Sequence, residues 1–294
     1  MSMELNDPGA VGAPPGYRFT EDQDAGGPER ALGIPSGSDV AYLQSIVNAT
    51  AEANLPLREA VDVLYMDELS PDEDEGGTSL RATPGGDSAQ GPYYAKTVRL
   101  SVVALDAVRR GRGGKYARDL AEQARDSSAF EAGRVLSAIA TQAAAVHCPV
   151  PVTEVSPDSP LRDIIAAARG LRETGYGGPL ELLLIGGLEG FETPDLNYLQ
   201  YFKMVFPGGV RPLPQTPHTE LSFQGLRVLG AVFDPSARGI RLDIGANLQL
   251  AWMGFGKGTH TFSLVTAARA TVVVPGSIRL LVGPPKPKAS PSES

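Results

Sequence analysis

The chain has 294 residues, of which 42% are apolar and 20% charged, so it is predicted to fold into one large or two smaller globular domains. Its formal net charge of -8 gives no overall attraction to a nucleic-acid backbone. The single cysteine, Cys148, excludes an intrachain disulfide and suits a reducing cytoplasm.

Residues 1–37 are rich in Gly, Pro, Asp and Glu and are predicted to be a mobile extension. They lack the basic and apolar regions of a signal peptide, and no apolar run in the chain approaches the ~18 residues of a membrane span. A helix with Ser38 as its N-cap follows. Its apolar residues recur at helical spacing, at Val40, Leu43 and Val47.

Pro56 interrupts the helical pattern, and alternating apolar residues from Val61 to Tyr65 predict a short strand. The stretch Ser70–Pro92 is acidic and Gly-rich, which is typical of a long flexible excursion. It leads into a strand with one apolar face, so the two together predict a long projecting hairpin. That face consists of Val98, Leu100 and Val102.

The stretch Lys115–Cys148 contains no proline and predicts a helix about 50 Å long, with His147 near its C-terminus. A coiled coil is the alternative, but no heptad is sustained. A second helix is predicted to begin with Ser159 as N-cap and Pro160 as its first residue, and to end at Gly175. The apolar stripe of the long helix contains Phe130, Val135, Leu136 and Ile139, and that of the second contains Leu161, Ile164, Ile165, Ala168 and Leu171.

The sequence ELLLIGG (residues 181–187) predicts a short buried strand, and a third helix is expected to start at Thr193–Pro194. Residues 206–218, FPGGVRPLPQTPH, are expected to form a rigid loop. Three β-prone runs follow, LRVLGAVFD, IRLDIGANLQLAW and THTFSLVTAARATVVVPGSIRLLV, separated by the turns PSARG and FGKG.

Candidate chemical motifs are weak. GFGKGT at 254–259 lies between two strands and lacks the phosphate-loop pattern, so a hairpin turn is expected. DEDEGG at 72–77 lacks the spacing of a calcium loop, and His147–Cys148 is too sparse for zinc. We therefore predict no enzymatic activity, no metal site and no cofactor.

Four stretches carry a resemblance to a known family. VRLSVVALDAVRRG resembles a loop strand that runs into a spine helix, and SSAFEAGRVLSAIAT resembles the spine with its Phe-Glu pair. IIAAARGLRETGYGGPLELLL resembles an apical helix and strand, and HTFSLVTAARATVVVPGSIRLLV resembles the closing strands. Over residues 38–282 their order is similar to that of the tailed-bacteriophage major capsid proteins, and within them most to the encapsulins.

The resemblance implies an α+β fold, the tailed-bacteriophage major capsid (encapsulin-like) fold, divided as follows. Residues 1–37 would be the extension, 38–66 the N-terminal helix and arm, and 67–105 the extended loop. Residues 106–149 and 259–282 would form the peripheral domain, 150–258 the apical domain, and 283–294 a disordered tail.

By the same resemblance, the function would be self-assembly into an icosahedral encapsulin nanocompartment in the cytoplasm, around a cargo enzyme. The alternative is a phage or prophage major capsid protein enclosing DNA in a virion. The compact apical segment and the lack of a long scaffold-like region favour the first. The expected partners are further copies of the chain and a cargo protein, with no membrane.

The resemblance also suggests site residues. Val40, Leu43 and Val47 would line a cargo groove, or else face the subunit's own core. Arg211 or His218 would lie near the rim of a pore, or else on a plain surface loop. Val98, Leu100 and Val102 would be covered by a neighbouring subunit. Arg269 and Arg279 would lie at an interface or on a solvated strand face.

Overall fold

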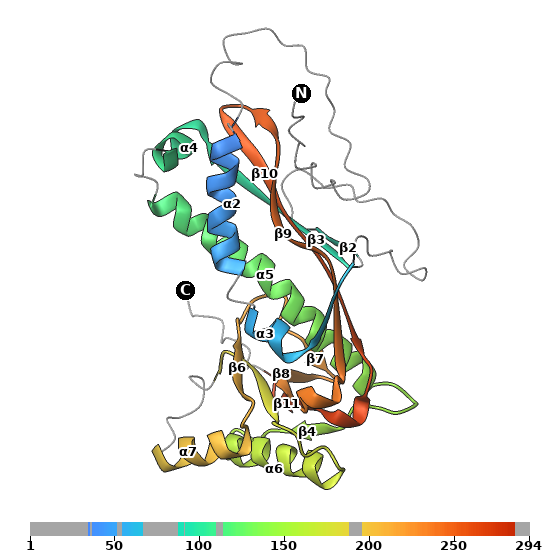
Figure 1. Ribbon diagram of the computed structural model, residues 1–294. Coiled ribbons are helices and arrows are strands. Elements are labelled where there is room, and N and C mark those ends of the chain that lie inside the picture. Colours follow the sequence, from blue (N-terminus) through green and yellow to red (C-terminus); the bar gives the residue numbers. More distant parts are fainter. Residues whose placement is uncertain are drawn as a thin grey trace, which may run out of the picture.

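The computed structural model describes residues 35, 37–51, 55–66, 88–90, 92–109, 114–187 and 196–285. Two β-sheets lie at opposite ends of the described part, and one long helix, α5 (Gly114–Ala143), runs diagonally from one to the other (Figure 1). The predicted extension, most of the acidic excursion, the start of the third helix and the C-terminal tail lie outside these residues.

The first sheet has five strands in the order β1-β9-β10-β3-β2. β1 pairs in parallel with β9, and the remaining neighbours are antiparallel. The hairpin between β9 and β10 turns at Lys257 and Gly258, both with positive φ (52° and 72°), which confirms the predicted turn and matches a type I′ connection. The strands are β1 (Asp62–Tyr65), β2 (Ser88–Gln90), β3 (Tyr93–Ser101), β9 (Ile240–Gly256) and β10 (Thr259–Val272).

Helices α2 (Gly37–Ala51) and α5 pack against the first sheet. The short helix α3 (Leu55–Ala60) lies between α2 and β1 in the chain, and α4 (Val102–Arg109) lies between β3 and α5. α2 confirms the predicted N-terminal helix, but it begins at Gly37, so Ser38 lies inside its first turn and is not the N-cap. Leu43 and Val47 of α2 pack in one apolar cluster with Val98 and Leu100 of β3. The apolar face of β3 is thus covered within the chain.

The long helix α5 has 30 residues and is therefore about 45 Å long. Its predicted apolar stripe is confirmed, because Phe130, Val135, Leu136 and Ile139 are all buried. The helix ends at Ala143, earlier than predicted. His147 is exposed in the bend that follows, so the prediction that it lies at the end of the helix is wrong.

The second sheet has the order β4-β11-β8-β5-β6, with the short β7 paired to β8. Helices α6 (Pro160–Glu173) and α7 (Leu196–Val205) pack against one face of this sheet. Ser159 and Pro160 occupy the predicted N-cap and first helical positions of α6, and Gly175 follows its end with φ of 96°. The strands are β4 (Val152–Glu154), β5 (Glu181–Ile185), β6 (Gly209–Leu213), β7 (Ser222–Phe223), β8 (Leu226–Phe233) and β11 (Ile278–Gly283).

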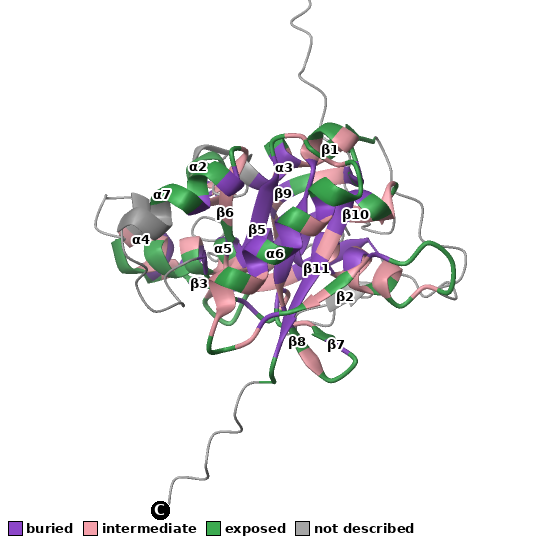
Figure 2. Ribbon diagram, turned by 90° about the horizontal axis from the view of Figure 1, so that it is seen from below, coloured by how far each residue is buried: buried purple, intermediate pink, exposed green. Residues whose placement is uncertain are grey.

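The second sheet is buried on both faces. On one face, Leu182 and Leu281 pack with Ile164 of α6 and Phe202 of α7. On the other face, Leu183 and Leu280 join the cluster that contains the buried stripe of α5. Figure 2 shows the buried residues running along the central strands, whereas α6 and α7 expose their outer sides. This explains why ELLLI reads as a continuous apolar run.

The central strands approach closely at Gly230 of β8. A Cβ atom at this position would lie 2.0 Å from the carbonyl oxygen of Leu183 in β5, so only glycine fits without moving a backbone.

The topology differs from the predicted division in several places. β9 (Ile240–Gly256) belongs to the first sheet, although residues 150–258 were predicted to form the apical domain. β11 belongs to the second sheet, although residues 259–282 were predicted to form part of the peripheral domain. Val102 begins α4 and is not a strand residue, since β3 ends at Ser101. The predicted loop 206–218 contains β6, which pairs with β5.

Candidate functional site

Two adjacent residues near the middle of α5, Phe130 and Glu131, hold other elements against the helix. The Phe130 ring stacks on Tyr94 of β3, with centroids 5.3 Å apart. The ring of His218 meets the rings of Tyr94 and Phe130 edge-on, at 4.5 Å and 5.7 Å. Gly133, one turn along, lets the backbone at His218 approach, because a Cβ there would lie 2.3 Å from its carbonyl oxygen. The aromatic cluster therefore joins α5, β3 and the segment before β7.

Glu131 forms a buried ion pair with Arg58 of α3. Two nitrogens of Arg58 donate to the two carboxylate oxygens of Glu131, Nε at 2.9 Å and Nη2 at 2.6 Å. The Glu131 side chain is 4% exposed and that of Arg58 is 16% exposed. Burial opposes the charged form of Arg58, but the hydrogen bonds and the charge of Glu131 outweigh it and raise its pKa. The pair therefore fixes the short helix α3 onto α5.

A second ion pair links the second sheet to the same helix α3. Arg211 of β6 donates through Nε and Nη2 to both oxygens of Glu181 on β5, and its Nη1 lies 3.4 Å from Glu59 of α3. The hydrogen bond to Glu181 is the main cause of a raised pKa at Arg211, although burial opposes it. Helix α3 is thus tied both to α5 and to the second sheet.

The residues predicted to line a cargo groove lie in the subunit's own core, with the exception of one. Leu43 and Val47 are 1% and 0% exposed, and Val40 is half-buried. The structure therefore favours the alternative that α2 faces its own chain. Val98 and Leu100 are 2% and 6% exposed, so the prediction that a neighbouring subunit covers them is wrong, because they lie in an apolar cluster with residues of α2, α4 and α5 of the same chain.

The two residues predicted near a pore rim are both engaged within the chain. Arg211 binds Glu181, and His218 packs against the aromatic cluster. Neither lies free on a loop. A pore at a symmetry axis would be formed by several copies of the chain, so the place of Arg211 and His218 near its rim stays a prediction.

The arginines of the closing strands are half-buried, which disagrees with a fully solvated strand face. The guanidinium of Arg279 on β11 lies against α6, since a Cβ at Gly170 would lie 2.6 Å from its Nη2. Arg269 on β10 lines a groove between β10 and α5, described next.

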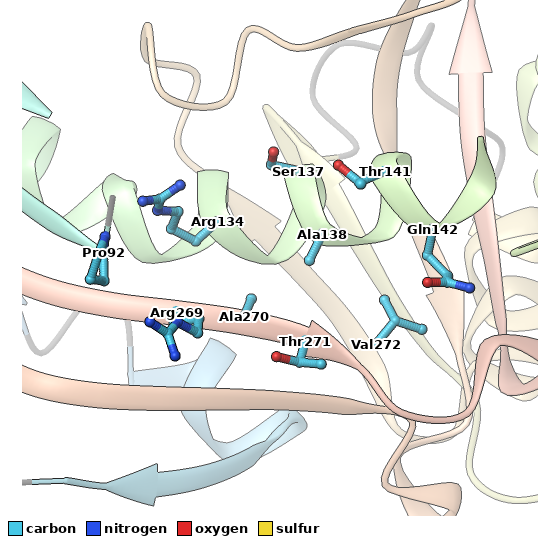
Figure 3. A pocket seen from close by; sticks show the side chains of 10 residues that line it. All are labelled: Pro92, Arg134, Ser137, Ala138, Thr141, Gln142, Arg269, Ala270, Thr271 and Val272. Carbon is cyan, nitrogen blue, oxygen red and sulfur yellow. The ribbon is translucent and has the colours of Figure 1, made fainter. Parts of the chain in front are cut away.

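The groove has a volume of about 290 Å³, just below the range of small-molecule pockets. Figure 3 shows Gln142 pointing from α5 toward β10, whereas the Arg134 side chain extends along α5; Pro92 lies at one end of the groove and Val272 toward the other. Arg134 also lies over the Phe130 ring, 4.9 Å from its centroid. The residues that line the groove are Pro92, Arg134, Ser137, Ala138, Thr141, Gln142, Arg269, Ala270, Thr271 and Val272.

Large apolar side chains are exposed on two elements, the edge strand β1 and the helix α7. Leu64, Tyr65 and Met66 are consecutive and are 48%, 63% and 40% exposed at the edge strand β1. On α7, Tyr201 and Met204 are 40% and 74% exposed. Sequence reasoning did not find these positions, because the strand alternation at 61–65 does not reveal which face is covered. Clustered apolar exposure of this kind marks a surface for contact with another molecule.

The described residues contain no group of three or more His, Cys, Asp and Glu side chains placed to bind a metal ion. None of their helices combines the length and hydropathy needed to cross a bilayer.

No protein-family profile and no curated protein sequence matches the chain. Among solved structures, the subunit of a virus-like particle from Pyrococcus furiosus has a TM-score of 0.55 at 14% identity, over 82% of this chain and 98% of that one. The capsid of an empty GTA particle reaches 0.46 at 14% identity, over 78% and 90% of the two chains. A chain of Mycobacterium phage Ogopogo reaches 0.40 at 16% identity, over 65% and 75%.

The first of these similarities establishes the fold. The order of elements over nearly the whole virus-like-particle subunit is shared, and this confirms the predicted α+β fold of the tailed-bacteriophage major capsid (encapsulin-like) type.

Proposed function

We propose that the protein is a shell subunit that self-assembles into a closed icosahedral compartment of the encapsulin type, enclosing a cargo enzyme in the cytoplasm. The observation that carries the proposal is the shared fold with a subunit that forms a virus-like particle, over 98% of that subunit's length. A match of this extent leaves no large part of the particle-forming subunit without a counterpart here.

The surface supports the same proposal. The structure exposes apolar side chains on two separate elements, β1 and α7. A subunit with separate contact patches that meet in a head-to-tail manner builds rings and larger closed assemblies. The buried ion pair of Arg58 and Glu131 holds α3 against α5, and Arg211 of the second sheet also lies 3.4 Å from Glu59 of α3.

Size and contents of the purified protein test the proposal. We expect particles of megadalton mass in light scattering and round hollow shells in negative-stain electron microscopy. A single species near the subunit mass of 30.9 kDa at physiological salt would refute shell formation. Particles from the native host should contain a co-purifying protein and little nucleic acid, in keeping with the net charge of -8. Long nuclease-protected DNA inside them would instead identify a phage or prophage capsid.

A further inference from the structure

One edge of the long strand β9 loses its strand partner partway along its length. β1 pairs with β9 from Arg241 to Ile244, and the amide of Met66 adds a last hydrogen bond to the carbonyl of Ile244, at 2.9 Å. β9 continues to Gly256, and its other edge stays paired with β10. Among the described strands, residues 245–256 of β9 therefore have a partner on one side only.

Helix α2 packs beside this part of β9, and one of its side chains binds the strand edge. The Oε1 atom of Gln44 accepts a hydrogen bond from the amide of Leu250, at 2.7 Å, and Nε2 donates to the carbonyl of Leu248, at 3.2 Å. Nε2 also donates to Oδ1 of Asn48, one turn along α2, at 2.7 Å. These bonds fix the direction of the side-chain amide, because the opposite direction would set two acceptors against each other at Leu248.

The Gln44 side chain bonds to β9 as one residue of a parallel strand would. In a parallel pair, a residue donates its N–H to the carbonyl of residue i−1 on the neighbouring strand and accepts from the amide of residue i+1. With Gln249 as residue i, Gln44 makes both bonds, since its amide has the donor and the acceptor of a peptide group. The side chain therefore continues, by one unit, the parallel ladder that β1 begins.

The open part of β9 has no protection of its own against another strand. Edge strands are usually protected by charged residues or proline, and residues 245–256, GANLQLAWMGFG, contain neither. Uncharged, apolar segments of this kind are those that add to one another as strands. Leu43 and Val47, which flank Gln44 in α2, pack in one apolar cluster with Leu248 and Leu250. This packing holds the Gln44 amide, itself half-buried, against the edge.

We propose that Gln44 closes the edge of β9 against strand addition by a second copy of the chain. A second copy fits the edge, because two identical strands can pair in antiparallel orientation about a two-fold axis. Such pairing would join subunits at a place that a closed assembly does not use. The inference goes beyond the proposed shell, since it concerns the separate subunit and holds whether or not particles form.

Hydrogen exchange in the full-length protein tests the contact at the edge. Gln44→Met keeps the length and helix propensity of the side chain but removes its polar groups. We expect the Leu250 amide, followed by mass spectrometry of peptides from this strand, to exchange about five-fold faster in the variant, the effect of losing one hydrogen bond. The matched control is Gln123→Met, the same change at a half-buried position of helix α5, and it should leave exchange at Leu250 unaltered.

Sedimentation tests the consequence for association. We expect Gln44→Met to leave several-fold more protein in a low-speed pellet than wild type, with the infrared band of intermolecular β-sheet. Adding Met253→Lys, a charge on the same strand at a side chain 43% exposed, should return the pellet to the wild-type amount. It should not restore slow exchange at Leu250, because lysine does not replace the lost hydrogen bonds. Val146→Lys, the same added charge at a side chain 89% exposed outside β9, should give no rescue.

Three outcomes would overturn the inference. Unaltered exchange at Leu250 in Gln44→Met would show that the side chain does not hold the edge. Fast exchange without aggregation would show that the open edge recruits no second copy. Equal rescue by Met253→Lys and Val146→Lys would assign the aggregation to lost stability.

A second variant decides the matter if Gln44→Met does not fold. Asn48→Ala removes only the exposed partner that orients the Gln44 amide, and should speed exchange at Leu250 by about two-fold. Exchange at the wild-type rate would then contradict the role of Gln44. A wild-type protein that forms no particles would refute the proposed shell but leave these measurements on the subunit intact, so the two failures are distinguishable.

Discussion

Removal of the Glu131 carboxylate should destabilise the subunit, because it leaves the Arg58 guanidinium without its counter-charge. Breaking a buried ion pair by removing one partner costs about 3–5 kcal/mol. Here the arginine is 16% exposed and keeps a hydrogen bond to Asn247, at 2.9 Å. Part of its charge can therefore be solvated in the variant. We expect Glu131→Ala to lower the free energy of unfolding by about 2–3 kcal/mol.

The reverse truncation should cost more. Arg58→Met leaves Glu131, only 4% exposed, as an uncompensated carboxylate in the core. We expect a loss at the upper end of the same range, about 4–5 kcal/mol. The double variant Arg58→Met with Glu131→Leu buries no charge and should recover most of the stability, so the cycle should be strongly non-additive.

Urea unfolding followed by the fluorescence of Trp252, the single tryptophan, measures these differences. All variants must be compared at one protein concentration, since assembly adds to apparent stability. Because the pKa of Arg58 is raised, the stabilisation from its charge is fully present at every pH below its ordinary pKa. It is lost only at strongly alkaline pH, as the pH rises through the raised value. The differences should therefore be the same at pH 6 and pH 8. A loss below about 0.5 kcal/mol for Glu131→Ala, or additive single effects, would refute the reasoning.

Three other substitutions separate the core from the surface. Leu100→Asp puts a carboxylate at a position that is 6% exposed, and should destabilise the subunit itself by about 3 kcal/mol or more, seen as a lower urea midpoint even in unassembled protein. Gly230→Ala forces a Cβ against the Leu183 carbonyl and should lower the melting temperature, whereas Gly186→Ala, with open space around it but φ of 75°, should cost less. Met204→Lys, at a side chain 74% exposed on α7, should leave unfolding within about 0.5 kcal/mol of wild type but reduce particle yield in light scattering. Unaltered particles would exclude that part of α7 from the subunit contacts.

Local patterning accounts for the elements that the sequence predicted correctly. The apolar stripe from Phe130 to Ile139 has the period of a helix, and the run from Glu181 to Ile185 has the length and composition of a buried strand. The turn at Lys257–Gly258 follows from the glycines around it, since Gly258 adopts positive φ without steric cost. These features depend on neighbours a few positions apart, so the sequence determines them by itself.

Local patterns of this kind do not predict which strands pair when they are far apart in the sequence. β9 and β11 are both β-prone runs, and nothing local distinguishes the first sheet that holds β9 from the second sheet that holds β11. The apolar face of β3 was recognised, but periodicity cannot say which surface covers it. The structure buries this face in a cluster with residues of α2, α4 and α5 of the same chain, where the sequence predicted a neighbouring subunit.

The ion pairs and the open strand edges were likewise decided only by the tertiary structure. Arg58 and Glu131 are separated by 73 positions, and charge alone does not select one partner among the chain's 34 acidic residues. In the described part of the chain, residues 270–272 of β10 form an edge because the pairing with β3 stops at Tyr93, opposite Ala267, whereas that with β9 continues to Ile240, opposite Val272. The sequence determined the period of each element. The tertiary structure decided which elements meet, because pairing and burial depend on contacts between residues far apart in the chain.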